Sequence, residues 1–405
     1  MKTAFLKKSI NGLALVAAIF LSMTVSCQKQ ETDLVSPSSE RNFSTWAEVF
    51  ESYWRAMNYN YVFWDIDETD WDEVYETYYP RFEALGTYSM STFEEAGALF
   101  DELSANLVDH HYTFMLKSTE YNYYVQPSGK EIATRDYYHE RMDLQQLVDN
   151  AHAGIGSGRV VSFEGAVSEV NGSDMFAMSY LIDDVAYIYF SNFYWTYLML
   201  YSADLENDPL YKVYENFFNL IDNTPGLKGV IIDVRNNGGG YINDAYYFYS
   251  KMMGESVQPM WTRTKNGLGR YDYGPWVPYI VDPAADSRNL QVPIVQIVDL
   301  YSVSMSEMSS LIVKELHNGV VVGERTYGGL GTLMGDFDYS YAGEVENASY
   351  WIYTTTTMSK DLHGNRLEGV GVIPDIEVLF DEAAFMSGND VQLEAALDYI
   401  ESAMR

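Results

Sequence analysis

The chain has 405 residues, of which 47% are hydrophobic, and 25 Lys and Arg against 58 Asp and Glu give it a net charge of −33. This charge excludes nucleic acid and anionic membrane surfaces as partners. The length predicts two or three domains. The 35 Tyr and 19 Phe are expected mostly in the core, and an aromatic groove for a polymer or peptide is left open.

Residues 1–27 are typical of a targeting segment. Three early lysines precede an apolar run at residues 13–23, which is too short to span a bilayer. The run leads to Thr-Val-Ser-Cys, which resembles a bacterial lipobox and ends at Cys27, the one cysteine of the chain. A lone cysteine here fits lipidation better than a disulfide or metal role. A plain signal peptide that happens to contain a cysteine is the alternative.

Residues 28–41 are polar, contain Ser and Pro, and are predicted to form a tether. No later segment has an apolar run of about 18 residues, so membrane contact is expected only through a lipid anchor at Cys27. The predicted location is the bacterial cell envelope, on the periplasmic side or the outer-membrane surface.

Residues 42–111 are predicted to form a helical unit. Apolar residues recur at helical spacing in three stretches that begin near Phe43, Trp71 and Phe93, and Pro80 lies just beyond the second. The aromatic stripe on these helices is expected to be core rather than a ligand site.

Residues 112–184 are the least regular segment, with short strand-like pieces and a helical stretch near residues 141–151. Apolar strands then alternate with helices over residues 185–405, which predicts an α/β core. The expected helices of this part include residues 242–253, 305–316 and 391–403.

Residues 292–330 are the most informative stretch. An apolar strand leads into a small-residue turn, then a helix, then a second apolar strand that ends in glycines. Such a turn can hold a serine at a helix N-terminus, where backbone N–H groups point at the group under attack. Ser304 is the candidate nucleophile, and Glu307, one helical turn later, is expected to orient the turn.

The sequence DVRNNGGG at residues 233–240 is a second candidate. Glycines at the end of a buried strand let the backbone approach a ligand and point N–H groups at it. A phosphate loop would need Lys and Ser/Thr, which are missing. Half of an oxyanion hole fits better, with N–H donors from Gly239 (or Gly238) and from Met305. A simple turn is the alternative.

Asp109, His110 and His111 form the third candidate, since two of the six histidines are adjacent here. No HExxH spacing or cysteine accompanies them, which argues against zinc. A general base for a serine is the sharper hypothesis, and a structural histidine is the alternative.

Together these segments resemble the tail-specific or C-terminal processing proteases, family 41 of the serine peptidases. VIIDVRNNGGG is similar to the family's strand and glycine turn, SVSMSE to its nucleophile segment, GERTYGG to its GExTFGKG turn, and EGVGVIPDIEV to its closing motif. The N-terminal helices resemble its cap. The resemblance covers residues 42–111 and 185–379, and it implies an α/β core of the ClpP/crotonase type with an N-terminal helical cap.

The resemblance places Ser304 on the nucleophile but removes one possible base. In the family's Ser-Lys branch a lysine of the FGKG turn is the base, and that position is Gly329 here. Lys314 comes too early and is expected on the helix after Ser304. A Ser-Lys dyad is therefore not expected.

The tricorn-type branch, which pairs serine with histidine and glutamate, is the closer resemblance. It implies His111 as the base and Glu368 as the residue that orients it. Serine needs a base, neutral imidazole can accept its proton near pH 7, and a carboxylate can stabilise the imidazolium. The family has a small residue before this histidine and Thr after it, whereas this chain has His110 and Tyr112, so His110 is the alternative. Glu368 as a plain loop acid also stays open.

Many members of the family carry a PDZ domain between cap and core. We predict that it is degenerate or absent in residues 112–184, which are short for such a domain and lack a clear carboxylate-binding loop. The sequence thus predicts a serine endopeptidase that acts on protein or peptide substrates in the cell envelope, with no cofactor and no metal. The alternatives are an inactive peptide-binding lipoprotein with the protease fold and, from aromatic content alone, a carbohydrate-binding lipoprotein.

Overall fold

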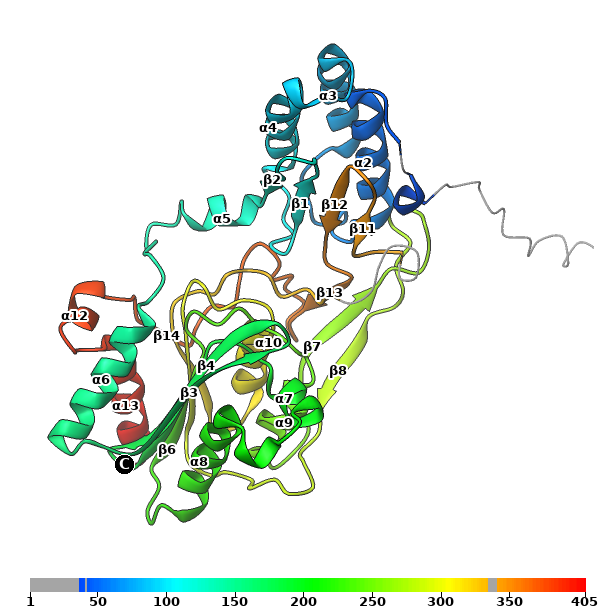
Figure 1. Ribbon diagram of the computed structural model, residues 1–405. Coiled ribbons are helices and arrows are strands. Elements are labelled where there is room, and N and C mark those ends of the chain that lie inside the picture. The colour runs from blue at the N-terminus through cyan, green and yellow to red at the C-terminus, as the bar shows by residue number, and fades with distance from the viewer. Residues whose placement is uncertain (1–35, 41, 334–340) are drawn as a thin grey trace, which may run out of the picture.

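The computed structural model describes residues 36–40, 42–333 and 341–405 (Figure 1). The predicted targeting segment, Cys27 and most of the predicted tether lie outside these residues. Among the helices that are described, none has the length and apolar run needed to cross a bilayer.

The cap unit, at the top of Figure 1, contains three helices packed on a small antiparallel sheet. The sheet has the strand order β11-β12-β1-β2. Its elements are α2 (Trp46–Asn60), α3 (Trp71–Leu85), α4 (Phe93–Ser104), β1 (Thr113–Leu116), β2 (Tyr123–Val125), β11 (Val345–Glu346) and β12 (Tyr350–Tyr353). The three predicted helical stretches are therefore present, and the predicted helical cap is confirmed.

Helix α3 continues through Pro80 to Leu85, beyond the predicted stretch. Phe82, in this extension, is fully buried and stacks on Phe50 of α2, with ring centroids 4.7 Å apart. Burial of a phenylalanine contributes about 1.5–3 kcal/mol, which offsets much of the proline's helix penalty of about 3 kcal/mol. Tertiary packing thus overrides the local signal.

The core unit is built on a seven-stranded sheet with the order β14-β10-β9-β6-β5-β4-β3. The pairs from β5 to β14 are parallel, whereas β3 and β4 are antiparallel additions at one edge. The strands are β3 (Val160–Val170), β4 (Ser173–Ile182), β5 (Val185–Phe190), β6 (Gly229–Asp233), β9 (Ile294–Val298), β10 (Gly319–Gly323) and β14 (Ile376–Glu377).

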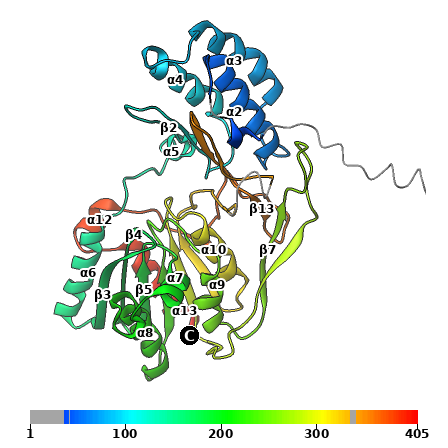
Figure 2. The same ribbon diagram turned by 45° about the vertical axis from the view of Figure 1, so that its right-hand side comes forward.

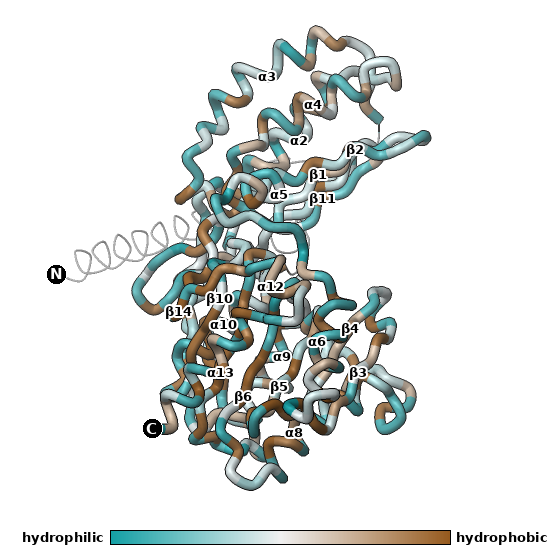
Figure 3. The backbone as a smooth tube through the Cα atoms, turned by 90° about the vertical axis from the view of Figure 1, so that its left-hand side faces the viewer, coloured by the Kyte–Doolittle hydropathy of each residue, from teal (hydrophilic) through white to brown (hydrophobic). Residues whose placement is uncertain are grey.

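Helices cover both faces of this sheet, which explains why its central parallel strands β5, β6 and β9 are fully buried and largely apolar (Figures 2 and 3). On one face lie α7, α8 and α10, and on the other lie α6 and α13, each face with its own hydrophobic cluster. The bounds of these helices are α6 (Leu144–Ser157), α7 (Trp195–Tyr201), α8 (Pro209–Asn223), α10 (Met305–Glu315) and α13 (Val391–Ala403). The predicted α/β core is confirmed.

The predicted helix at residues 242–253 is largely wrong. The segment forms only the short α9 (Asp244–Tyr247) and η4 (Tyr249–Lys251). The carboxylate of Asp244 is buried and accepts the N–H groups of Trp195 and Thr196. This long-range anchor holds the segment against α7, which local spacing could not reveal.

The predicted boundaries at residues 111 and 184 do not match the structural units. Strands β1 and β2 of the middle segment belong to the cap sheet, whereas β3 and β4 belong to the core sheet. Strands β11 and β12, expected in the core, pair with β1 in the cap. The boundaries fail because strand pairing depends on contacts between distant segments, which the sequence pattern does not show.

A third sheet connects the two units (Figures 1 and 2). It has the order β13-β7-β8 and is fully antiparallel. Its strands are β7 (Val257–Thr264), β8 (Val277–Val281) and β13 (Thr357–Lys360), and the remaining short elements are α5 (Pro127–Ile132), α12 (Glu382–Met386), η1 (Pro37–Ser39), η2 (Met90–Thr92) and η3 (Leu205–Asn207).

Candidate active site

Ser304 lies in the turn between β9 and α10, at the carboxyl end of a central parallel strand. This is where ligands bind in open α/β sheets. Its backbone has φ 61° and ψ −115°, a conformation that a residue with a side chain rarely adopts. The cost is of the order of 1–3 kcal/mol and is typical of functional turns. Ser304 is half-buried and lines a cavity of about 670 Å³.

Glu307 holds this turn in place from a fully buried position. Its carboxylate accepts hydrogen bonds from the N–H groups of Ser304 (3.1 Å), Gly328 (2.8 Å) and Gly329 (2.7 Å) and from the Thr326 hydroxyl (2.7 Å). Burial raises the pKa of Glu307 to about 7, although these hydrogen bonds favour the charged form. Glu307 therefore joins the Ser304 turn to the glycines at residues 328 and 329, which is how it can orient the turn as predicted.

His111 lines the same cavity as Ser304, although it comes from the link between α4 and β1. A methyl group added at Gly329 would lie 3.2 Å from His111 Cε1 and 3.0 Å from Val303 Cγ2. The carbonyl of Gly329 accepts the N–H of Ser304 at 3.0 Å. The imidazole therefore lies beside the residue that holds the nucleophile turn, and it occupies space that a side chain at position 329 would need.

The His111 ring has unsatisfied hydrogen-bonding capacity. Its Nδ1 is buried and has no hydrogen-bond partner among the described residues. Burial, and to a smaller extent the neighbouring His110, lowers the pKa of His111 to about 4. The imidazole is therefore neutral at pH 7, the form that can accept a proton.

Glu368 and Asp109 are buried carboxyl groups beside this ring. One potential ligand atom from each of Asp109, His111 and Glu368 lies within 4.8 Å of the other two. Glu368 accepts the N–H groups of His110 (3.0 Å) and Gly331 (2.9 Å). Burial, with repulsion from Asp109, raises the pKa of Glu368 well above its usual range. The structure thus places Glu368 next to the His111 ring rather than in an exposed loop.

Asp109 is the residue of this group for which the sequence suggested no separate role. Its carboxylate accepts the His111 N–H at 2.9 Å and both the N–H (2.9 Å) and hydroxyl (3.0 Å) of Thr355. Burial raises its pKa to about 6. Asp109 therefore fastens the histidine backbone to the chain after β12. Its position two residues before His111 was visible in the sequence, but its partner was not.

His110 points to a different place. Its Nδ1 lies 2.9 Å from the carbonyl oxygen of Tyr327, and its ring lines another cavity, together with Glu131 and Pro127. Burial lowers its pKa. Of the two histidines, His111 is the one that lines the Ser304 cavity.

The two glycines predicted as oxyanion donors have other acceptors. The N–H of Gly239 donates to Asn237 Oδ1 at 2.8 Å, and that of Gly238 donates to the Ser191 carbonyl at 3.2 Å. A substrate oxyanion would have to share or displace these bonds. The backbone of Gly239 still packs tightly on the turn, because an added methyl group would lie 2.6 Å from Ser304 Cβ and 3.0 Å from the nitrogen of Met305. Met305, at the first position of α10, lines the cavity.

Asp109, His111 and Glu368 also have the ligand types of a metal site. Both carboxylates, however, already accept several hydrogen bonds. Binding a cation would require these bonds to be shared and both carboxyls to be ionised, against the upward shift of their pKa values. The prediction that no metal is needed is tested by chelation.

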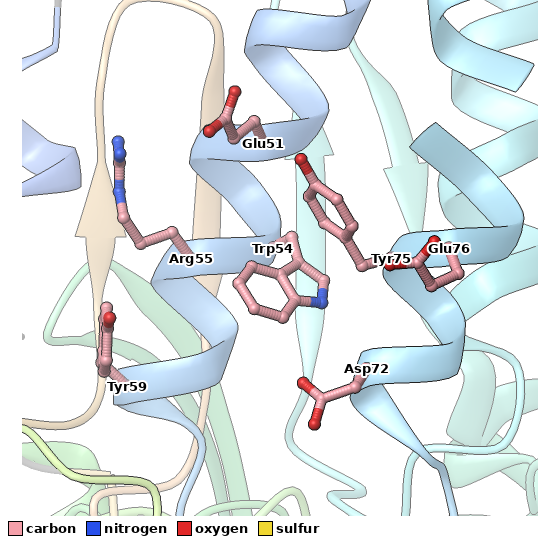
Figure 4. A pocket seen from close by; sticks show the side chains of 7 residues that line it. All are labelled: Glu51, Trp54, Arg55, Tyr59, Asp72, Tyr75 and Glu76. Atoms are coloured by element: carbon pink, nitrogen blue, oxygen red, sulfur yellow. The ribbon is translucent and has the colours of Figure 1, made fainter. Parts of the chain in front are cut away.

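A second cavity, of about 410 Å³, lies between α2 and α3, far along the chain from Ser304 (Figure 4). Trp54 and Tyr75 approach each other there, with ring centroids 5.0 Å apart. Three carboxylate side chains surround the rings, and no serine, cysteine or histidine lines the cavity. We therefore assign the candidate active site to the Ser304 cavity.

Comparison with known proteins agrees with this fold. Residues 184–378 match the family model described as "Peptidase family S41", and residues 44–89 match that described as "Tricorn protease C1 domain". The first match contains Ser304 and Glu368, and the second lies in the cap. Both the fold and the resemblance predicted from sequence are thereby confirmed.

The curated relatives are tricorn proteases. The chain is 26% identical to the tricorn protease of Thermoplasma acidophilum over 192 residues. This match covers 47% of this chain and 16% of that protein. It is 24% identical over 194 residues to a tricorn protease homolog of Saccharolobus solfataricus, covering 47% and 16%. The matched regions are thus only about a sixth of the length of these relatives.

Solved structures share the fold over nearly the whole chain. A Parabacteroides merdae structure has a TM-score of 0.63 at 20% identity and covers 88% of this chain and 97% of its own. Mature CPAF in complex with lactacystin has a TM-score of 0.56 at 11% identity, covering 89% and 97%. The α/β core under a helical cap is the fold that these structures share with the chain. Residues 184–378 of the chain are similar to peptidase family S41.

Proposed function

We propose that this chain is a serine endopeptidase that hydrolyses peptide bonds with Ser304 as nucleophile, His111 as general base and Glu368 as the carboxyl that stabilises the imidazolium. The observation that carries the proposal is the shared cavity of Ser304 and His111, with buried Glu368 beside the imidazole. The absence of a side chain at Gly329 supports it, because the imidazole packs closely there, with Cε1 only 3.2 Å from where a Cβ would lie.

In the proposed reaction, neutral His111 accepts the Ser304 hydroxyl proton as Oγ attacks the substrate carbonyl carbon. The N–H of Met305 is the proposed donor to the developing oxyanion, helped by the N–H of Gly239 or Gly238 once the oxyanion competes with its present acceptor. The imidazolium then protonates the leaving amine. Water repeats the sequence on the acyl-enzyme and releases the acid, so no cofactor is consumed.

A fluorophosphonate probe tests the nucleophile. We expect it to label the chain between about pH 6 and 9, a range over which imidazole with a lowered pKa stays neutral. Ser304→Ala should abolish labelling and peptide hydrolysis. Ser302→Ala is the matched control, because this buried hydroxyl donates to the Val234 carbonyl instead of lining the cavity. Labelling that persists in Ser304→Ala would refute the assignment, and no labelling at any pH would favour an inactive peptide-binding protein.

The proposed location is the bacterial cell envelope, with a lipid on Cys27. The support is the sequence pattern of residues 13–27 alone. Metabolic labelling with a fatty acid should mark the chain, and Cys27→Ser should remove the label and release the protein from the membrane fraction. A Cys27→Ser chain that still carries the label would contradict lipidation at this residue.

A further inference from the structure

Four tyrosines form a continuous row of rings that begins in the Ser304 cavity. Tyr194 and Tyr241 both line this cavity, and their ring centroids lie 5.9 Å apart. Tyr197 follows, with its centroid 5.8 Å from that of Tyr241. Tyr201 ends the row, 4.8 Å from Tyr197, and is 67% exposed. We call these four residues the tyrosine row, which leads from the cavity of the nucleophile to the surface.

Backbone contacts hold the row close to Ser304. The backbone of Gly239 packs on the nucleophile, since an added methyl group would lie 2.6 Å from Ser304 Cβ. Tyr241 follows two residues later, so its Cα lies within about 7.6 Å of the Gly239 Cα. Its N–H donates to the Phe193 carbonyl at 2.8 Å, and the Phe193 N–H donates to the Gly239 carbonyl at 2.8 Å. The row therefore begins about two extended residues from the serine.

Packing within the protein does not account for the outer half of the row. Tyr194, Tyr197 and Tyr201 are spaced by three and four residues, which places them on one face of α7. A face of this kind normally packs on a core. Here Tyr197 is only half-buried and Tyr201 is largely exposed, so the aromatic face extends beyond the core that it joins.

The surroundings of the row favour an uncharged ligand group. Among the described residues that line the Ser304 cavity there is no Asp, Glu, Lys or Arg, although 20% of the chain is charged. Apolar side chains lie there instead, among them Met305, Met308 and Leu330. A Lys or Arg side chain would be attracted to tyrosine faces, but it would lose hydration in this cavity without a carboxylate to pair with.

We propose that the tyrosine row binds an aromatic side chain of the peptide substrate, within about two residues of the bond that Ser304 attacks. The inference rests on the proposed peptidase function and adds a substrate class to it. An aromatic ring fits the row better than an aliphatic chain of the same size, because edge-to-face and offset ring pairs are stabilised beyond the burial of their area.

Binding tests this preference without cleavage. We would measure fluorescence anisotropy on the full chain carrying Ser304→Ala, with four labelled, C-terminally amidated peptides of one Ala-Ser sequence. They differ only at the central residue, which is phenylalanine, cyclohexylalanine, arginine or alanine. Cyclohexylalanine keeps the size of the ring and removes its π system. The salt concentration is about 0.5 M, where the Debye length is about 4 Å and the net charge of the chain no longer favours arginine.

The phenylalanine peptide should bind about tenfold more tightly than the alanine peptide and about threefold more tightly than the cyclohexylalanine peptide. With the unaltered chain, mass spectrometry should place the cut in the phenylalanine peptide within two residues of the ring. A cyclohexylalanine or arginine peptide that binds as tightly as the phenylalanine peptide would overturn the proposal, and so would a cut farther from the ring.

Tyr241→Leu should bring the ratio of phenylalanine to cyclohexylalanine binding close to one. Tyr201→Leu should lower it less, and it provides a variant whose fold is safe because the side chain is largely exposed. Tyr124→Leu is the matched control, since Tyr124 is 62% exposed on β2 of the cap sheet, and it should leave the ratio unchanged.

The melting temperature shows whether each variant is folded. If neither Tyr241→Leu nor Tyr201→Leu lowers the ratio, the row does not bind the ring. Fluorophosphonate labelling of the unaltered chain is independent of these results. Labelling without a preference for phenylalanine means that this inference fails, whereas a preference without labelling means that the proposed catalysis fails.

Discussion

The two sides of the candidate active site are built in different ways. The nucleophile side consists of neighbouring strand ends, and Glu307 binds the turn of Ser304 to the chain after β10 through four hydrogen bonds. The base side is assembled at the junction of cap and core, where His111 keeps a buried Nδ1 without a partner.

The two sides therefore depend on different parts of the structure. The Ser304 turn is held by hydrogen bonds between residues of the core unit alone. The histidine requires the cap to be seated, because Asp109 anchors its backbone to Thr355, 246 residues later. We therefore expect changes on the nucleophile side to affect stability strongly and changes on the base side to affect mainly the rate.

Replacing the base should have the largest effect. His111→Ala is expected to lower kcat by about 10²–10⁴-fold, the usual contribution of a general base. The free energy of unfolding should change little, because the ring's buried Nδ1 has no partner to lose. Steady-state kinetics and denaturant unfolding measure the two effects.

His110→Ala is the control, because that ring lines another cavity and contacts the Tyr327 carbonyl. It should keep most of the kcat. If His110→Ala loses most of the kcat and His111→Ala keeps it, His110 is the base.

Glu307→Gln probes the other side of the comparison. Four groups now donate hydrogen bonds to the carboxylate, two to each oxygen. In the amide, the NH₂ group would replace one oxygen and face two of these donors. Each buried N–H left without an acceptor costs about 1–3 kcal/mol, so we expect a loss of about 2–5 kcal/mol in the free energy of unfolding. Urea denaturation followed by circular dichroism gives this value. A loss below about 1 kcal/mol would mean that the turn does not depend on Glu307.

The same contrast explains how much could be predicted from sequence. The strand, turn and helix around Ser304 are consecutive, so hydrophobic patterning and small residues were enough to predict this turn and its candidate nucleophile. The acceptors of the Gly238 and Gly239 N–H groups could not be predicted in this way. One is the Asn237 side chain and the other is the Ser191 carbonyl on another strand end.

The histidine pair was a candidate from the sequence itself, but the preference for His111 and the choice of Glu368 came from family resemblance. Nothing in local spacing shows that β1 pairs with β12 or that residues after β13 return to the cap. Contacts between distant segments determine these features, and a single sequence does not contain that information in readable form.

The pH dependence of activity provides a smaller effect. Burial lowers the pKa of His111 to about 4, so the base stays neutral and active until the pH falls through that value. The acid limb of kcat/KM should therefore have an apparent pKa well below the 6.5 of free imidazole. A shift of two pH units corresponds to about 2.7 kcal/mol. An acid limb at or above 6.5 would show that the ring is solvated, or that ionised Glu368 already pairs with it before the Ser304 proton is transferred.

Chelation tests whether the base side serves serine chemistry alone or also binds a metal ion. If Asp109, His111 and Glu368 serve only serine chemistry, EDTA should change neither activity nor thermal stability. The measurement is peptide hydrolysis and the melting temperature with and without EDTA. A loss that zinc or another divalent cation restores would establish a metal site at these residues.

Relieving the backbone strain at Ser304 should give the smallest measurable change. Glycine adopts φ 61° and ψ −115° with less strain than serine, which would gain about 1–3 kcal/mol. The more flexible unfolded chain offsets about 0.5–1 kcal/mol of this gain. Ser304→Gly should therefore be about 1 kcal/mol more stable than Ser304→Ala, and both should be inactive. In the regular part of α10, Ser310→Gly should instead be less stable than Ser310→Ala by about 1 kcal/mol. If glycine is the less stable variant at both positions, the turn does not store strain, and the stability of the nucleophile side comes from Glu307 alone.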